Sequence, residues 1–284
     1  MKDLLNNPLV IQLIDIAFAE DIGPGDYTSL ATINANESGK SIIVAKDEGV
    51  LAGLGLAEYI FKKVDPSLQV KLLMHDGDKV KYGDVVLEVQ GSSRSMLTAE
   101  RTVLNFVQRL SGVATQTAKY VVELQGLKTH ILDTRKTTPG MRLLEKWAVK
   151  IGGGENHRIG LYDMILIKDN HVDFAGGIAQ AIQRTKDYLA ANHLALKIEI
   201  ETRSIDELKQ VMAVGGVERI MLDNFSPELL VEAVAIVNGK YETEASGGIT
   251  LQTLRSYAET GVDFISSGAL THSVKAMDLS MRAV

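Results

Sequence analysis

Cysteine is absent from the 284 residues of this chain. Its absence excludes disulfide bonds, thiolate metal sites and a cysteine nucleophile, and it is typical of proteins from a reducing compartment. Aromatic residues make up only 5% of the chain and no long basic run occurs, so the composition argues against a nucleic-acid partner. Acidic residues such as Asp15 and Glu20 interrupt the apolar positions near the start, and no membrane-spanning run follows. We therefore expect a cytoplasmic protein without a signal peptide or membrane contact.

One stretch differs in charge from the rest of the chain. The formal net charge is −6, but residues 133–171 hold seven cations against five anions, a local net of +2. The same stretch holds His157, His171 and a run of three glycines that we expect to end a helix. An excess of cations beside glycines in an acidic protein indicates a pocket for a small anionic ligand. Apolar residues make up 45% of the chain, enough for one large or two ordinary domains.

The first part of the chain mixes helical and strand patterns. Apolar spacing predicts a long helix over 98–125, with Gly112 as a candidate break. Within this helix, spacing alone describes Arg101 and Arg109 as surface arginines. Glycine turns around 76–84 predict a small β-hairpin unit resembling those of lipoyl and biotinyl carriers, but no suitable lysine stands at a tip. The other elements expected before this helix are helices over 9–18 and 54–64, a turn-rich loop over 20–29, and strands over 41–47 and 69–75.

After Gly126, short apolar strands alternate with amphipathic helices. Helix start signals lie between the strands, including a capping box from Ser204 to Glu207 and an N-cap at Ser226 followed by Pro227. Repeated β-then-α units require a parallel sheet with right-handed crossovers. Periodicity does not separate an incomplete α/β barrel from a doubly wound sheet, so both remain open. The six predicted strands are 129–133, 164–168, 196–201, 219–223, 241–245 and 264–267.

Polar residues and glycines follow each of these strands. In both architectures ligands bind where parallel strands end at their carboxyl side, so we expect these residues to meet. Two of the strand ends, Ser246–Gly248 and Ser267–Ala269, can present backbone N–H groups to a phosphate, and ordinary turn glycines are the alternative. The other strand ends are Asp133–Lys136, Lys168–His171, Glu199 with Glu201, and Asp223–Asn224.

The strand-end side chains predict anion and metal chemistry. Glu201 and Asp223 can hold Mg²⁺ on a pyrophosphate or accept hydrogen bonds from ribose hydroxyls. Structural pairing of these carboxylates with nearby cations such as Lys168 is the alternative. Glu199 lies two residues before Glu201 and therefore faces the same side of its strand. No zinc motif includes His157, which we expect to bind an anion or donate a hydrogen bond beside Arg158 rather than bind zinc.

The stretch DTRKTTPGMRLLEKWAVKIGGGENHRIGLYDMILIKDNH, residues 133–171, resembles the core motif of the quinolinate phosphoribosyltransferase family. The resemblance continues through AERTVLNFVQRLSGVAT, residues 99–115, and then through IEIE, MLDNF, SGGIT and ETGVDFISSGALTHSV. It covers nearly the whole chain, including the EDIGPGDYTS loop near the start. Ordered motifs of this length are far more specific than any single element above.

The resemblance implies a type II phosphoribosyltransferase built from two domains. An N-terminal α/β sandwich would span residues 1–112, and an open, incomplete, seven-stranded α/β barrel would span 113–271, with the tail 272–284 packing back on the sandwich. Because the residues alone predict six strands, one further or shorter strand is implied. The resemblance also implies a homodimer, with further assembly left open, in which Arg101 reaches the substrate of the neighbouring subunit. That role replaces the surface assignment of Arg101.

The resemblance further implies transfer of phosphoribosyl from phosphoribosyl pyrophosphate to quinolinate. Loss of CO₂ and pyrophosphate would give nicotinate mononucleotide for NAD biosynthesis, with Mg²⁺ and no organic cofactor. The catalytic set would be Lys136, Glu201 and Asp223, and Glu201 and Asp223 would be the metal ligands. The residues expected around quinolinate are Arg101, Arg135, Lys136, His157, Arg158 and Lys168. Those expected around phosphoribosyl pyrophosphate are Lys136, Lys168, Glu201, Asp223, Ser246, Gly247, Gly248, Ser267, Gly268 and Ala269.

Two other functions remain open from the sequence. A paralogue associated with molybdenum uptake shares the fold and DTRKT-like motifs, but the full set of cations matches the quinolinate enzyme better. A non-catalytic sensor of phosphorylated sugars would need only the glycine loops. It would leave Arg101, Arg135 and Arg158 without a role.

Overall fold

The computed structural model describes the backbone of residues 2–284 and side chains from residue 4 onward. The chain forms two compact units. Unit 1 contains residues 1–118, 137–153 and 270–284, and unit 2 contains residues 119–136 and 154–269. The segment 137–153 therefore clusters with the first part of the chain, although it lies within the sequence range expected for the barrel. Within the described residues, no helix is both long and apolar enough to cross a membrane.

Unit 1 is built on an antiparallel sheet with the order β12-β1-β5-β3. The tail strand β12 pairs with β1 along five residues, from Ser41 with Ala283 to Ala45 with Leu279. The unit contains a second, two-stranded sheet of β2 and β4. The hairpin predicted around residues 76–84 was wrong, because β4 pairs with β2 whereas β5 pairs with β1 and β3. The strands are β1 (Ser38–Ala45), β2 (Gly49–Val50), β3 (Gln69–Leu72), β4 (Lys79–Val80), β5 (Val85–Ser92) and β12 (Leu279–Ala283).

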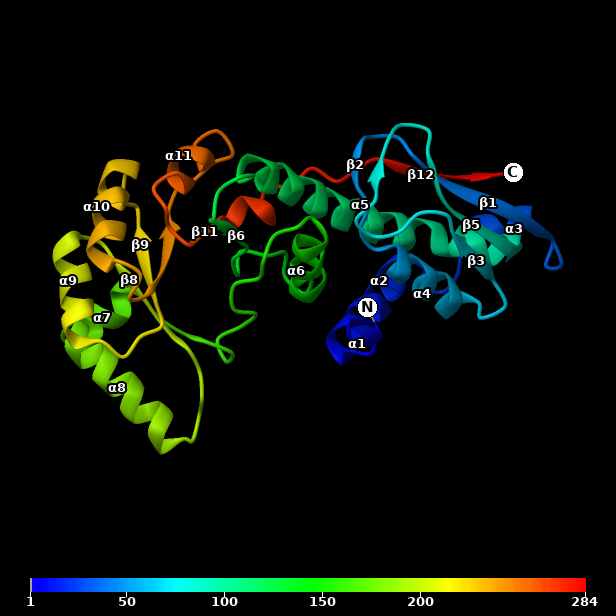
Figure 1. The fold of residues 1–284 in the computed structure, drawn as a ribbon. Helices are drawn as coiled ribbons and strands as arrows, with labels where there is room; N and C mark the ends of the chain where they lie inside the picture. The colour runs from blue at the N-terminus through cyan, green and yellow to red at the C-terminus, as the bar shows by residue number, and fades with distance from the viewer. Residues whose placement is uncertain (1) are drawn as a thin grey trace. The chain divides into compact units, whose positions relative to one another are not determined.

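The helices of unit 1 begin at polar caps. The side chain of Asn7 caps the second helix, which has Pro8 in its first turn, and Asp26 caps a short helix inside the segment expected to be only a loop. Gly53 has a φ of +102° and lies against Val107 and Leu110 of the long helix. The helices are α1 (Lys2–Leu5), α2 (Pro8–Asp21), α3 (Tyr27–Thr32), α4 (Leu54–Val64), α5 (Ser93–Glu123) and α6 (Arg142–Ile151) (Figure 1).

Gly112 does not break the long helix, so that expectation was wrong. α5 is continuous from Ser93 to Glu123. A side chain at residue 112 would collide with the backbone carbonyl of Lys275, which belongs to the tail of the chain. The glycine therefore permits close approach of two backbones rather than a change of helix direction.

Unit 2 contains six parallel strands in the order β6-β11-β10-β9-β8-β7, which confirms all six predicted strands. An isolated parallel bridge joins Leu132 of β6 to Glu155, at the edge opposite β7. This bridge extends the sheet by one residue beyond the six predicted strands. The strands are β6 (His130–Leu132), β7 (Ile165–Ile167), β8 (Ile198–Thr202), β9 (Arg219–Asp223), β10 (Glu242–Ser246) and β11 (Phe264–Ser266).

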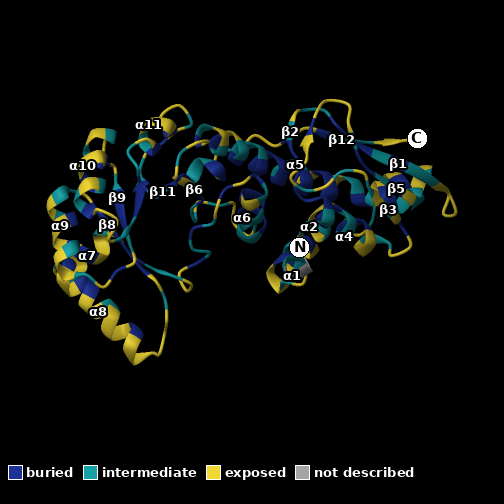
Figure 2. Ribbon diagram, in the orientation of Figure 1, coloured by how far each residue is buried: buried dark blue, intermediate teal, exposed yellow. Residues whose placement is uncertain are grey.

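Helices cover the outer side of these strands (Figure 1). The strands of unit 2 are largely buried, whereas α8, α9 and α10 expose their outer sides (Figure 2). Ser204 accepts the backbone N–H of Glu207, and Ser226 accepts that of Leu229, so both predicted helix starts are confirmed. The helices are α7 (Asp169–Ala175), α8 (Ile178–Ala191), α9 (Ile205–Val214), α10 (Pro227–Val237), α11 (Leu254–Ala258) and the 3₁₀ turn η1 (Gly268–Leu270).

Candidate active site

Strand register gathers the predicted acidic residues on one face of the parallel sheet, here called the inner face. Glu199 pairs in register with Arg219, and Ser246 pairs with Asp223. Paired residues share a face and side chains alternate along a strand, so Glu201, two residues after Glu199, points to the same side. The inner face therefore has a lower layer that includes Glu199 and Arg219, and an upper layer toward the carboxyl ends that includes Glu201, Asp223 and Ser246.

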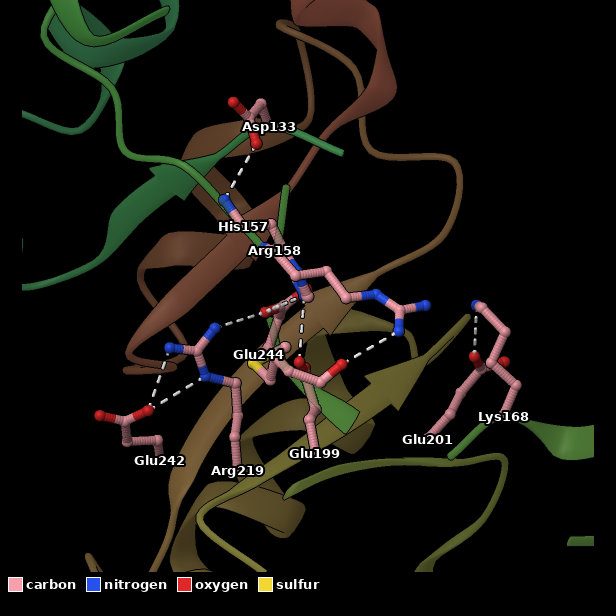
Figure 3. Close-up of polar contacts among 10 residues, drawn as sticks. Asp133, His157, Arg158, Lys168, Glu199, Glu201, Arg219, Glu242 and Glu244 are labelled. Atoms are coloured by element: carbon pink, nitrogen blue, oxygen red, sulfur yellow. Dashed lines mark hydrogen bonds and ion pairs between the residues drawn. The ribbon is translucent and has the colours of Figure 1, made fainter. Parts of the chain in front are cut away.

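The lower layer holds a buried polar cluster around His157 (Figure 3). The imidazole Nε2 lies 3.0 Å from Glu199 Oε2 and 3.5 Å from Glu244 Oε2. Arg219 donates to Glu244 at 3.0 Å and, through two nitrogens, to Glu242 at 3.0 and 3.1 Å. The side chains of Glu199 and Glu244 have no exposed surface, so these charges interact without screening by water.

Burial controls the protonation of this cluster. It raises the pKa of Glu199 to about 7, and Arg219 is the main opposing influence. Burial also raises the pKa of Glu244 to about 7, and the charge of Glu199 raises it further. Burial alone would lower the pKa of Arg219, but Glu244, Glu199 and Glu242 together hold it above its ordinary value. The cluster therefore favours a charged arginine and resists ionisation of both inner carboxyls.

His157 is oriented by its own backbone and by its neighbour. The backbone N–H of His157 donates to Asp133 Oδ1 at 2.9 Å, and the ring Nδ1 of His157 accepts the backbone N–H of Arg158 at 2.7 Å. Asn156 also donates to Asp133, at 2.6 Å. Because Nδ1 is an acceptor, the ring hydrogen of a neutral imidazole lies on Nε2, which faces Glu199. Both ring nitrogens therefore have protein neighbours.

The upper layer holds the predicted metal and ribose residues. Lys168 Nζ lies 3.0 Å from Glu201 Oε2, so the structural pairing considered from the sequence is present (Figure 3). Burial raises the pKa of Asp223, and the neighbouring charge of Glu201 raises it further. A cation bound beside Glu201 and Asp223 would relieve this repulsion, so the two carboxylates fit the expected Mg²⁺.

Cations follow β6, the bridge residue Glu155 and β7 along the chain. Arg158 donates to the carbonyl of Met164 at 3.2 Å, and burial followed by the charge of Arg135 lowers its pKa. Arg135 is half-buried and Lys136 is exposed. Two guanidinium groups that repel each other in a partly buried place are suited to an anion, because a dianion between them would remove the repulsion.

The two glycine loops lie at the ends of β10 and β11. Gly247 and Gly248 have φ angles of +100° and +65°, and a side chain at Gly247 would collide with Asn224. The helix expected near Thr250 begins at Leu254, although the Leu254 N–H already bonds to the Thr250 carbonyl. Gly268 directly opens the 3₁₀ turn η1, after Ser267. Both loops end next to the upper layer in the sheet register, where a phosphate would meet backbone N–H groups.

The two arginines of the long helix differ from each other. Arg101 lies on α5 in unit 1 with an exposed side chain. Arg109 donates through Nε and Nη2 to Glu145, at 3.0 and 2.7 Å, and Glu145 is fully buried. The surface assignment of Arg109 was therefore wrong, because spacing on one helix does not reveal a buried carboxylate on another.

Three residues around the site were missed from the sequence: Asp133 as the anchor of His157, Arg219 and Glu244. The available signal was charge inside a strand, because Glu242 and Glu244 alternate with Thr243 and Ala245 through β10. Among the described residues, His157, Glu199 and Glu244 form the one group of three side chains spaced closely enough to hold a metal ion. Neither Glu201 nor Asp223 belongs to it.

Comparison with known proteins agrees with this geometry. The family described as "Quinolinate phosphoribosyl transferase, N-terminal domain" matches residues 26–111, and its C-terminal counterpart matches residues 113–282. A quinolinate phosphoribosyltransferase [decarboxylating] of Nicotiana glauca is 46% identical, covering 95% of this chain and 81% of that protein. The probable nicotinate-nucleotide pyrophosphorylase [carboxylating] of Bacillus subtilis is 44% identical over 98% of this chain and 94% of its own length.

Solved structures agree as well. The nicotinate-nucleotide pyrophosphorylase from Francisella tularensis superimposes with a TM-score of 0.92, at 42% identity and covering 99% of both chains. NadC from Streptococcus pyogenes has a TM-score of 0.92 at 38% identity, covering 97% of both chains. Both domains, the open parallel sheet and the sequence along its full length therefore place this chain in the quinolinate phosphoribosyltransferase family.

Proposed function

We propose that this protein transfers the phosphoribosyl group of phosphoribosyl pyrophosphate to quinolinate and releases CO₂ and pyrophosphate, giving nicotinate mononucleotide for NAD biosynthesis. One observation carries the proposal: a single sheet edge combines repelling guanidinium groups, a pair of carboxylates and two glycine loops. These three parts suit a dianionic acid, a sugar with its metal, and a phosphate. The molybdenum-associated and sugar-sensor alternatives gain no support from the relatives described above, which carry the names of quinolinate or nicotinate-nucleotide enzymes or NadC.

The cations would hold quinolinate. Its two carboxylates match the forked donors of Arg135 and Arg158, which bind carboxylates in a fixed orientation. Lys136 and Lys168 add point charges near the position of the sugar. His157 would act through Arg158, because its Nδ1 already accepts the Arg158 N–H. The pyridine nitrogen would thereby be held in line with the ribose carbon that it attacks.

The acidic pair and the glycine loops would hold phosphoribosyl pyrophosphate. Glu201 and Asp223 would hold Mg²⁺, which when bound neutralises charge on the pyrophosphate. Backbone N–H groups of Ser246–Gly248 and Ser267–Ala269 would bind the 5′-phosphate. Lys168, paired with Glu201 before substrate binds, is placed to stay near the developing charge.

Catalysis would rest on positioning and charge. As the nitrogen attacks, the bond to pyrophosphate breaks and the ribose becomes oxocarbenium-like, and Glu201 and Asp223 supply negative charge near it. The product of this step carries a pyridinium. When the neighbouring carboxylate departs as CO₂, its electron pair stays on the ring carbon and is stabilised by the adjacent positive nitrogen. A proton then replaces CO₂ on that carbon.

A direct assay tests this function. The protein is incubated with quinolinate, phosphoribosyl pyrophosphate and Mg²⁺, and CO₂ and nicotinate mononucleotide are measured. We expect both products in equal amounts, and no turnover of nicotinate, because nicotinate lacks the carboxylate that the second guanidinium would bind. Absence of product, or equal turnover of nicotinate, contradicts the proposal.

We also propose a homodimer in which Arg101 completes the partner's site. This proposal is supported by the exposure of Arg101 on α5 and by the family resemblance of its motif. Arg101→Ala and Lys136→Ala proteins should each be inactive. After subunit exchange, each mixed dimer should regain about half the wild-type activity, since one of its two sites has both residues.

A matched mixture controls for this recovery. Arg101→Ala protein mixed with the double variant Arg101→Ala/Lys136→Ala should stay inactive, because neither site of that mixed dimer receives an intact arginine. If confirmed mixed dimers of the two single variants stay inactive, Arg101 does not act in trans.

A further inference from the structure

Glu244 is a buried carboxyl next to a second buried carboxyl. One oxygen of Glu244, one of Glu199 and a ring nitrogen of His157 all lie within 4.8 Å of one another. Arg219 donates to Glu244 Oε2 at 3.0 Å. Within the part of the chain that the structure describes, no donor in hydrogen-bonding geometry reaches Glu244 Oε1 or either oxygen of Glu199. Buried carboxylate oxygens without a donor are costly, so the cluster needs one more hydrogen.

A proton on Glu244 satisfies this need. It would turn Oε1 into a donor toward Glu199 and would remove one of two adjacent negative charges. The remaining carboxylate charge would then be balanced by Arg219. A divalent ion would instead add two positive charges beside the guanidinium of Arg219, in a place where Arg158 and Lys168 also act on Glu199. Charge balance therefore favours the proton over a metal ion.

We propose that Glu244 is a positioning residue that keeps its proton, donates it to Glu199 and thereby holds His157 against the backbone of Arg158. The connection is continuous: Glu199 lies 3.0 Å from Nε2 of His157, and Nδ1 accepts the Arg158 N–H at 2.7 Å. The proposal rests on the proposed function, because Arg158 matters to catalysis as a ligand of quinolinate. Glu244 itself lies on the inner face, two residues before the predicted phosphate loop.

The surroundings of Glu244 set the pH range of this effect. The groups that act on it are Glu199 on β8, Arg219 on β9, Ser266 on β11 and His157. Burial is the largest influence and raises its pKa from 4.5 to about 7. A carboxyl whose pKa is raised on folding makes its full contribution to the free energy of unfolding below pH 4.5, and this contribution is lost as the pH rises through about 7. Above that value Glu244 and Glu199 would repel each other and loosen the support of His157.

Glutamine at position 244 tests the proposal. The amide of Glu244→Gln is a permanent donor of nearly the same shape as the protonated acid. We expect its KM for quinolinate to stay within about threefold of wild type, and to remain constant where the wild-type KM rises above about pH 7. Glu244→Ala should raise this KM about tenfold at all pH values, because it leaves Glu199 without a donor. In both variants the KM for phosphoribosyl pyrophosphate should change less than the KM for quinolinate does in Glu244→Ala.

Two further measurements do not need activity. In infrared difference spectra between low and high pH, wild-type protein should show the C=O stretch of a buried protonated carboxyl, and Glu244→Gln should lack it. The melting temperature of wild type should fall across the same pH range relative to Glu244→Gln. Glu242→Gln is the matched control, because Glu242 lies on the same strand, also pairs with Arg219 and is 40% exposed. It should retain the infrared signal and the wild-type pH dependence.

These readouts separate failure of the proposal from failure of the function. If Glu244→Gln is folded but loses quinolinate binding as Glu244→Ala does, or keeps the infrared signal, Glu244 does not hold the proton. If the wild type turns over no quinolinate, the proposed function fails, and the infrared and melting data still decide whether Glu244 is protonated.

Discussion

Replacing Arg158 with alanine is expected to lower kcat/KM for quinolinate by about 10²- to 10³-fold, mostly through KM. Arg158 is half-buried, and its guanidinium donates a hydrogen bond to the Met164 carbonyl at 3.2 Å. Removing one partner of a desolvated charge pair costs about 2–5 kcal/mol, and each 1.4 kcal/mol is about tenfold. The repulsion between Arg158 and Arg135, which lowers the pKa of Arg158, would also vanish. The variant should therefore gain less thermal stability from quinolinate than wild type does.

Two variants control this prediction. Arg158→Lys keeps the charge but loses the fork, and we expect most of the affinity loss to remain. Arg203→Ala removes an exposed arginine of unit 2 that pairs with Asp173 and Glu207 on the surface. It should leave kcat/KM within about twofold, because exposed ion pairs contribute little. A loss confined to the KM for phosphoribosyl pyrophosphate would assign Arg158 to the other substrate.

The upper layer could be predicted from the sequence because it depends on local rules. Apolar runs located six strands, and the residue after each run had to lie at the carboxyl end of the sheet. Because side chains alternate along a strand, the spacing of Glu199 and Glu201 assigns both to one face without knowledge of the neighbouring strands. These rules need only positions along one strand. They therefore predicted the sheet edge, although the roles of its residues in binding remain predictions.

The lower layer could not be predicted, because it depends on register between strands. Glu199 meets Arg219 and Glu244 only because β9 lies between β8 and β10 with Met221 opposite both Glu201 and Glu244. A shift of one residue would turn Glu244 to the helix-covered side. The same limit applies to Gly112, whose purpose is contact with the tail, and to Arg109, whose partner lies on a helix more than thirty residues later. Such contacts are set by tertiary packing.

Replacing Glu145 with alanine is expected to lower the free energy of unfolding of unit 1 by about 3 kcal/mol. Glu145 is fully buried and accepts Arg109 at 2.7 Å and the backbone N–H of Thr138 at 3.0 Å. Without it, a largely buried guanidinium would lose its counterion, and the segment after Lys136 would lose an anchor. Arg109 would keep the Thr271 carbonyl at 2.5 Å, which limits the loss. For a unit of this size the melting temperature should fall by about 6–12 °C.

A matched surface pair separates this effect from the mere loss of a charge. Glu58 and Lys62 form an ion pair at 2.6 Å on α4, with both side chains partly exposed. Glu58→Ala should cost at most about 0.5 kcal/mol. Glu145→Gln keeps the size and an acceptor for Thr138 but not the charge, so its melting temperature should fall between wild type and Glu145→Ala. The three variants would be compared by thermal and urea unfolding with the same probe of unit 1. Equal stability of Glu145→Ala and Glu58→Ala would mean that Arg109 and Glu145 contribute no more than a solvated pair, despite the burial of the carboxylate.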